Sequence, residues 1–189
     1  MARRLDPADR RAEILATTMG IISTRGYQGL SLREVARVCG MSAPGLLHYF
    51  ADLPSLLLAV LAYRDAIDLE ALGPDVPGGP HLRPFLDRVV RYNSERPEAA
   101  RFFAMLQGEA LNPQHPAHEF FRKRTATGVE AAASLLDPAD GDPTLRARSI
   151  LAVMDGLQLN WLSDPDNFDL NAQWAVVADA LLPRAETVA

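Results

Sequence analysis

The sequence predicts an all-α protein. Apolar residues recur at helical spacing in nearly every segment, and no segment shows the sustained apolar–polar alternation of a β-strand. Segments rich in Gly and Pro, such as LGPDVPGGPHL at residues 72–82, separate the helical stretches. With 189 residues, of which 48% are hydrophobic, the chain is long enough for one large or two small domains.

The N-terminal part of the chain predicts four helices, at residues 9–25, 32–39, 42–49 and 53 to about 71. Four apolar residues of the first share one face: Ile14, Leu15, Met19 and Ile22. Gly26 is suited to end that helix, and Ser31 to cap the start of the next.

The remaining sequence predicts five further helices, at residues 82–95, 97–111, 117–136, 144–163 and 169–182. The breaks between them contain Pro, Gly, Asp or Asn, as in NPQHP at 112–116. The apolar residues of the last helix follow the helical repeat throughout: Trp174, Val177, Ala178, Leu181 and Leu182. No internal repeat is present.

The charge is distributed unevenly. The whole chain carries a formal net charge of −5, but residues 1–50 hold seven arginines against four acidic residues, a net charge of +3. The rest has 12 basic and 20 acidic residues, a net charge of −8. A basic N-terminal region beside an acidic remainder favours a protein that brings one end to a polyanion.

We expect a cytoplasmic protein. Cys39 is the only cysteine, so no disulfide can form within the chain. The charged start MARRLDPADRRAEIL lacks the apolar core of a secretory signal. The longest apolar run, LLLAVLAY at residues 56–63, is far shorter than the roughly 20 residues of a membrane span.

The second and third predicted helices fit a helix-turn-helix. Ala36 is small enough for two helices to cross closely, and Gly40 tolerates the positive φ of a tight turn. Leu46 can bury its side chain against the preceding helix. We expect a small core of Leu32, Val35, Leu46 and Leu47, with Met41 beneath the turn and Cys39 buried beside it. By itself this spacing occurs in many helical hairpins.

The flanking residues make the match more specific. The segment GYQGLSLREVARVCGMSAPGLLHYFADLPSLLL, residues 26–58, resembles the N-terminal domain of the TetR family of transcriptional regulators. The matching positions are Gly26, Tyr27, Ser31, Ala36, Gly40, Met41, Ser42, Leu46, Tyr49 and Phe50. The resemblance implies a three-helix helix-turn-helix DNA-binding domain at residues 1–52, followed by a larger helical ligand-binding and dimerisation domain at residues 53–189.

Two positions depart from the family pattern. Ala43 stands where the family often has Lys, and Leu53 with Pro54 stands where it commonly has Lys-Glu. Because both lysines would touch the DNA backbone, affinity for phosphate must come from other residues.

Such proteins place the third helix in the major groove. The predicted DNA-binding residues are Ser31, Arg33, Arg37, Ser42, Ala43, Pro44, Gly45, His48 and Tyr49. Ser31 and the two arginines would bind phosphate, as would Tyr49 by the resemblance. His48 would contact phosphate or guanine, and the small apolar residues thymine methyl groups.

Pro44 fits the first turn of a helix that Ser42 caps, because its missing amide has no partner there. Gly45 costs ~1 kcal/mol of helix propensity relative to Ala. Either close approach to DNA or simple tolerance beside the turn would explain it. Arg3 and Arg4 would form a minor-groove arm or a solvated terminus.

The resemblance further implies a homodimer formed by the last two helices, with predicted interface residues Ile150, Val153, Met154, Leu157, Trp174, Val177, Ala178 and Leu181. It also implies a pocket for a small-molecule effector. The predicted lining is Phe102, Phe103, Met105, Leu106, Glu109, Phe121, Gln158, Asn160 and Trp161. No cofactor is expected.

We therefore expect a ligand-responsive DNA-binding transcriptional regulator and not an enzyme, most simply a repressor released from a palindromic operator by a small molecule. Two alternatives remain. His115 and His118, with nearby glutamates, could hold a metal in a helical-bundle enzyme, although paired Glu-x-x-His motifs are missing. A helical interaction protein without a DNA role is the other.

Overall fold

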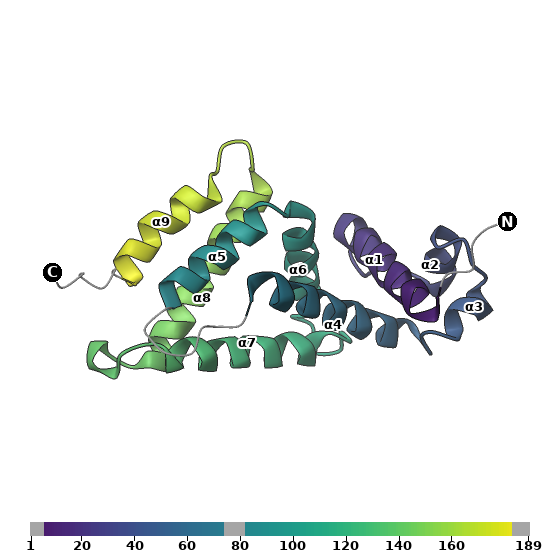
Figure 1. The fold of residues 1–189 in the computed structure, drawn as a ribbon, viewed down its shortest axis with the longest axis horizontal. Coiled ribbons are helices and arrows are strands. Elements are labelled where there is room, and N and C mark those ends of the chain that lie inside the picture. Colours follow the sequence, from purple (N-terminus) through teal and green to yellow (C-terminus); the bar gives the residue numbers. More distant parts are fainter. Residues whose placement is uncertain (1–5, 74–81, 183–189) are drawn as a thin grey trace. The chain divides into compact units, whose positions relative to one another are not determined.

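The computed structural model of the protein describes residues 6–73 and 82–182. Within these ranges it consists of nine α-helices and one short 3-10 turn, without a β-strand, which confirms the all-α prediction (Figure 1). The α-helices are α1 (Pro7–Arg25), α2 (Leu32–Val38), α3 (Ala43–Leu47), α4 (Leu53–Leu72), α5 (Leu82–Ser94), α6 (Pro97–Glu109), α7 (His118–Ser134), α8 (Pro143–Ser163) and α9 (Leu170–Leu181).

Side-chain caps explain where several helices begin. The side chains of Ser31, Ser42 and Asp169 each accept a hydrogen bond from a backbone N–H three residues later, at 3.0 to 3.2 Å. Asp6 caps α1 and is followed by a proline in the first helical position, so this helix begins two residues earlier than its apolar pattern indicates.

The chain forms two compact units. Unit 1 comprises the described residues up to Ala71 together with Arg101–Phe121. Its core contains α1, α2, α3 and α4 side chains and residues of the second segment. The fully buried large residues of this core are Ile14, Leu15, Ile22, Val35, Leu46, Leu56, Leu57, Val60, Leu61, Phe102 and Leu106.

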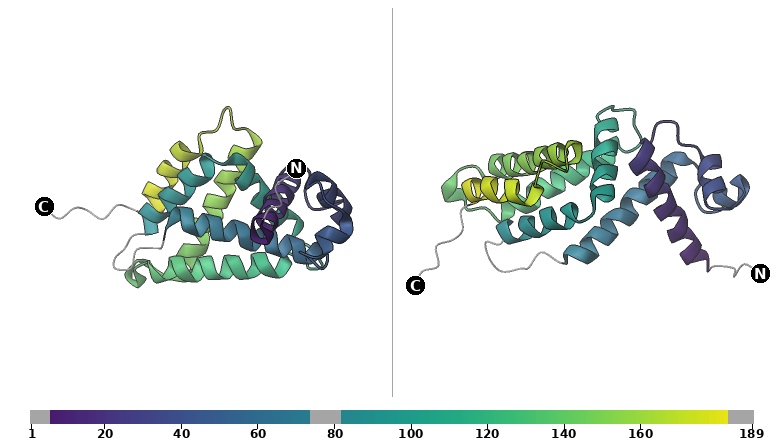
Figure 2. Two further views of the ribbon diagram at one scale, coloured as in Figure 1. Left: turned by 45° about the vertical axis from the view of Figure 1, so that its right-hand side comes forward. Right: turned by 90° about the horizontal axis from the view of Figure 1, so that it is seen from above.

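Unit 2 comprises the described residues of Leu72–Ala100 and those from Arg122 onward. Helices α5, α8 and α9 lie side by side in it (Figure 2), and Trp174 of α9 is buried in its core. The indole N–H of Trp174 donates to Asp87 Oδ1 at 2.7 Å. Arg83 donates to both Asp87 and Asp179, at 2.8 and 2.9 Å, so polar contacts also tie α9 to α5.

The units do not follow the predicted domain boundary after residue 52. Leu56, Leu57, Val60 and Leu61 of α4 are buried in the same core as α1–α3, so unit 1 is larger than the three predicted N-terminal helices. The boundary at residue 52 therefore stays a functional prediction. Among the described residues, none of the helices combines the length and the apolar composition that a membrane span requires.

Candidate DNA-binding site

Helices α2 and α3 form a helix-turn-helix. Ala36 is 1% exposed, and its carbonyl accepts from the N–H of Met41 at 2.9 Å, which closes the turn. Gly40 has a φ of +64°, a backbone conformation that residues other than glycine rarely adopt. Val35 and Leu46 are fully buried between the two helices and α1. The predicted roles of these residues in the turn and core are confirmed.

Ser31 lies at the start of α2, where its Oγ accepts from the N–H of Glu34 at 3.2 Å. Its side chain is exposed, as are those of Arg33 and Arg37 one turn apart on the same helix. Glu34 is paired with Arg25 at 2.6 Å. The positive charge of the two α2 arginines is therefore presented beside the Ser31 cap.

Helix α3 is only five residues long and has its proline in the first turn, as the sequence predicts. Ser42 Oγ accepts from the N–H of Gly45 at 3.1 Å. A Cβ atom added to Gly45 would lie 3.1 Å from the same Oγ and 3.6 Å from the Met41 methyl group. The structure thus supplies a local reason for Gly45, which is the close packing of the cap against the first turn.

The exposed face of α3 carries Ser42, Pro44, Leu47 and His48. Leu47 is 49% exposed, so the prediction that it belongs to the small core is wrong. Adjacent residues of a helix point about 100° apart. Because Leu46 fills the core, its neighbour is turned outward. Leu47 is therefore a candidate DNA contact that was not predicted from the sequence. Its position next to the buried Leu46 could have indicated its outward orientation.

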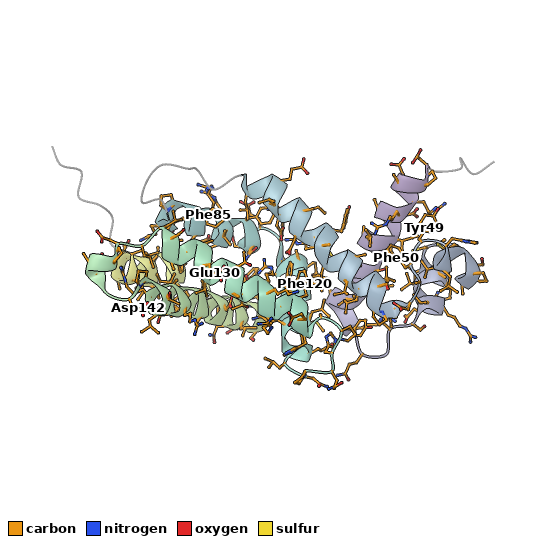
Figure 3. The ribbon with its side chains drawn as sticks, turned by 90° about the horizontal axis from the view of Figure 1, so that it is seen from below. Tyr49, Phe50, Phe85, Phe120, Glu130 and Asp142 are labelled. Atoms are coloured by element: carbon orange, nitrogen blue, oxygen red, sulfur yellow. The ribbon has the colours of Figure 1, made fainter. Side chains whose placement is uncertain are left out.

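Tyr49 and Phe50 follow His48, the C-cap of α3 (Figure 3). Phe50 is 4% exposed, and the guanidinium of Arg11 lies 5.0 Å from the centre of its ring. Tyr49 is partly buried against the same core, with its N–H bonded to the carbonyl of Leu46 at 2.9 Å. Phe50 thus anchors the end of α3, and Tyr49 is held beside it.

Cys39 at the end of α2 and Asp52 after α3 have shifted pKa values. Burial raises the pKa of the Cys39 thiol, and the neighbouring Glu13 adds to this, which fits the predicted small buried residue. Hydrogen bonds from the side chain and the backbone N–H of Ser55 lower the pKa of Asp52. Asp52 therefore places a negative charge at the start of α4, where Leu53 and Pro54 offer no cation.

Comparison with known proteins identifies the family of this helix-turn-helix protein. The family model for bacterial regulatory proteins of the tetR family matches residues 14–60. The model for the C-terminal part of BetI-type transcriptional repressors matches residues 81–183, which is more than half of the chain. The chain belongs to the TetR family. It is a ligand-responsive DNA-binding transcriptional regulator.

Individual relatives agree. The HTH-type transcriptional regulator PksA of Bacillus subtilis (strain 168) is 26% identical over 177 residues, which cover 87% of this TetR-family chain and 84% of PksA. A TetR-family regulator from Rhodococcus sp. is 26% identical, with a TM-score of 0.70 over 92% of this chain and 98% of that one. NalD, the secondary repressor of the MexAB-OprM multidrug efflux pump in Pseudomonas aeruginosa, shares the fold at 18% identity, with a TM-score of 0.71 over 94% and 95% of the two chains.

The predicted effector-pocket residues of this TetR-family protein fall in both units. In unit 1, Phe102 and Phe103 of α6 and Phe120 and Phe121 of α7 form a phenylalanine cluster whose ring centres are 5.4 to 6.2 Å apart. Leu106 is fully buried beside them, and Met105 is partly buried. In unit 2, Trp161 is buried in the core.

The predicted polar anchors of that pocket have partners within the protein. Gln158 accepts from the side chain of Asn93 at 2.8 Å, and the Asn160 side chain donates to the carbonyl of Gly156 at 2.8 Å. Glu109 accepts from the backbone N–H of Tyr27 at 3.0 Å. The pocket stays a prediction that now depends on the aromatic residues more than on these three.

Part of the predicted dimer interface is buried within unit 2. Ile150, Trp174 and Ala178 are at most 3% exposed in the core of unit 2, so they offer no surface to a second copy. Met154, Leu157 and Leu181 are partly buried against the same core, and Val153 and Val177 are also half-buried. Three of the eight predicted interface residues therefore belong to the core of unit 2, and the other five stay a prediction.

The two histidines proposed as metal ligands have separate partners. His115 Nδ1 accepts from the N–H of Ala117 at 3.2 Å, and His118 Nδ1 lies 2.8 Å from the carbonyl oxygen of Ala110. Among the described residues, no three His, Cys, Asp or Glu side chains are grouped so that they could hold a metal ion. Neither alternative to a regulator gains support. Arg3 and Arg4, the predicted minor-groove arm, lie outside the described residues.

Proposed function

We propose that this protein is a repressor that binds a palindromic operator through α3 and leaves it when a small apolar molecule binds. The observation that carries the proposal is the outward face of α3, with Pro44, Leu47 and His48 exposed while Leu46 holds the helix in the core. Family members described as repressors, such as NalD, support the direction of control. Few polar groups lie on this face, so sequence would be read largely through methyl contacts and DNA shape.

A homodimer would supply the second reading helix that a palindrome requires. We place its interface on the outward faces of α8 and α9, because Leu145, Leu159 and Val176 are 62%, 53% and 71% exposed there. Small residues such as Ala152 and Ala172 share these exposed faces and allow two helices to approach closely. We also place the protein in the cytoplasm, where bacterial DNA is accessible.

An apolar effector is proposed because of the phenylalanine cluster on α6 and α7. Phe103 and Phe120 are only partly buried, so these two rings keep some accessible surface. By preferring the conformation that does not bind DNA, such a ligand would lower operator affinity.

Footprinting on the DNA that flanks the protein's own gene tests the function. We expect a protected palindrome at nanomolar to micromolar protein concentration, and its loss with one class in a panel of small apolar compounds. With His48→Ala or Tyr49→Ala, the same protection should need at least about ten-fold more protein, because each substitution removes a proposed hydrogen bond to DNA. Gln107→Ala, at an exposed position of α6, is the control. A chain that protects no DNA at low salt would overturn the proposal.

A further inference from the structure

The last residue of α6 contacts the turn between α1 and α2 (residues 26–31), 82 positions earlier in the chain. Glu109 Oε1 accepts from the backbone N–H of Tyr27 at 3.0 Å, inside unit 1. A hydrogen bond from a backbone amide to a carboxylate is about twice as strong as one between neutral groups. The carboxylate of Glu109 therefore fixes the chain where it leaves α1.

Gly26 makes this approach possible. It ends α1 with its N–H bonded to the carbonyl of Ile22 at 2.8 Å, and its φ is +76°. A Cβ atom at this position would overlap with Glu109 Oε1. Gly29, in the same turn, also has a positive φ, of +85°, but a Cβ there would meet nothing within 4 Å. Substitution of either glycine would strain the backbone, but only substitution of Gly26 would also displace the Glu109 carboxylate.

His115 completes the contact from the segment between α6 and α7. Its Nδ1 accepts from the N–H of Ala117, so in the neutral ring the proton is on Nε2. Nε2 lies 3.5 Å from Glu109 Oε2, and both atoms are buried without a hydrogen-bond partner in the described part of the chain. The His115 ring also packs edge-on against Tyr27, with centres 5.0 Å apart. The other Glu109 oxygen thus faces a buried imidazole nitrogen.

The turn held in this way leads directly to the DNA-binding residues. The N–H of Leu30 bonds to the carbonyl of Tyr27 at 3.1 Å, and the next residue is Ser31, the cap of α2. Glu109 and His115 lie on the segment Arg101–Phe121, and the chain passes from unit 2 into unit 1 within α6 and back within α7. A displacement of either helix is therefore transmitted covalently to this carboxylate and imidazole.

We infer that Glu109 and His115 are positioning residues, which hold the α1–α2 turn so that α2 and α3 meet DNA in the binding orientation. The inference rests on the proposed function, because it assigns to that function the contact through which α6 and α7 control the reading helix.

Operator affinity of full-length variants tests it, by fluorescence anisotropy at fixed salt with the footprinted duplex. Glu109→Ala should weaken binding about ten-fold, because it removes the acceptor of the Tyr27 N–H. Glu109→Gln should restore most of the affinity, since an amide oxygen can still accept that bond. Gly26→Ala should weaken binding more than Gly29→Ala. Its effect should also be non-additive with Glu109→Ala, whereas that of Gly29→Ala should add.

A measurement on the wild-type chain needs variants only to assign its signals. With ¹⁵N-labelled histidine, saturating operator should shift the ring nitrogens of His115 as well as those of His48, with assignments from His115→Phe and His48→Ala. His115 signals that stay unchanged while His48 shifts would overturn the inference and leave DNA binding intact. Wild-type affinity in Glu109→Ala would also overturn it. Failure of the wild type to bind any duplex would instead refute the proposed function.

Discussion

Asp52 lies between α3 and α4, and its carboxylate accepts hydrogen bonds from Ser55. The Asp52 Oδ1 atom accepts from the Ser55 N–H at 2.7 Å, and the Ser55 side chain also bonds to it, which lowers the pKa of the carboxyl. The pKa of Tyr27 is raised mainly by burial of its side chain. The negative charge of Asp52 is the second cause of this shift. One exposed carboxylate thus influences both the start of α4 and the turn before α2.

This pKa shift predicts how stability depends on pH. Because the pKa of Asp52 is lower in the folded than in the unfolded chain, its ionisation favours folding. The contribution is complete above the ordinary carboxyl pKa of about 3.9 and is lost as the pH falls through the lowered value. Asp52→Asn keeps a good N-cap without the charge. We expect the wild type to be the more stable at pH 7 and the difference to vanish in acid, as measured by urea unfolding. A difference that is independent of pH would contradict the assignment.

At the scale of a single element, α3 contains two adjacent leucines with opposite roles. Leu46 is fully buried and Leu47 is 49% exposed. Leu46→Ala should lower the free energy of unfolding by about 2–5 kcal/mol, because it leaves a cavity under the helix. Leu47→Ala should change it by no more than about 0.5 kcal/mol.

DNA binding should separate the same pair in another way. Leu47→Ala should lower operator affinity about five-fold while the protein stays folded, because the lost side chain would be buried against a sugar or thymine methyl. Anisotropy titration beside circular dichroism measures both properties. If Leu47→Ala binds as the wild type does, Leu47 is not a DNA contact.

Helix α9 depends on a polar contact as well as on apolar packing. Trp174→Phe removes the indole N–H that donates to Asp87 and should lower the free energy of unfolding by about 1–2 kcal/mol. Chemical unfolding in urea provides the measurement. Gln173→Ala, at the exposed neighbouring position, should change it by at most about 0.5 kcal/mol. Equal losses in the two variants would argue against a specific role for the indole hydrogen bond.

At the scale of the whole molecule, the proposed dimer makes the strongest demand on the outer surface. Val176→Glu should convert the dimer to a monomer, because it places a charge in the centre of an apolar contact. Operator affinity should then fall by at least about a hundred-fold, since the helix-turn-helix motifs of the two copies are no longer linked. Sedimentation velocity gives the oligomeric state. Leu111→Glu, at a position 79% exposed in unit 1, should remain dimeric. Unchanged sedimentation of Val176→Glu would place the interface elsewhere.

The helices of the molecule could be predicted from the sequence because their signals are local. Ser31 and Ser42 mark helix starts and Gly40 marks the turn, and in each case the bond or dihedral angle that the residue type favours is present. Ala36 and Leu46 were placed correctly because a helix-turn-helix needs a small and a large apolar residue at fixed spacing. These features require no knowledge of the rest of the chain.

Which surface covers an apolar stripe could not be predicted in this way. Periodicity shows that Ile150, Trp174 and Ala178 lie on inward-looking faces of their helices, but not whether the covering surface is the same chain or a second copy. The contact of Glu109 with Tyr27 was equally inaccessible, because the partners are 82 residues apart and neither is unusual in its local sequence.

A five-residue helix with a proline and a glycine would not persist as a free peptide, because helix nucleation in water needs many more residues. Its shape comes from Leu46 below and the Ser42 cap in front. The outward positions therefore contribute little to folding and are free to change in evolution. If these positions contact DNA as proposed, a lineage could acquire a new operator by exchanging Leu47 or His48, one at a time, without first repairing the fold.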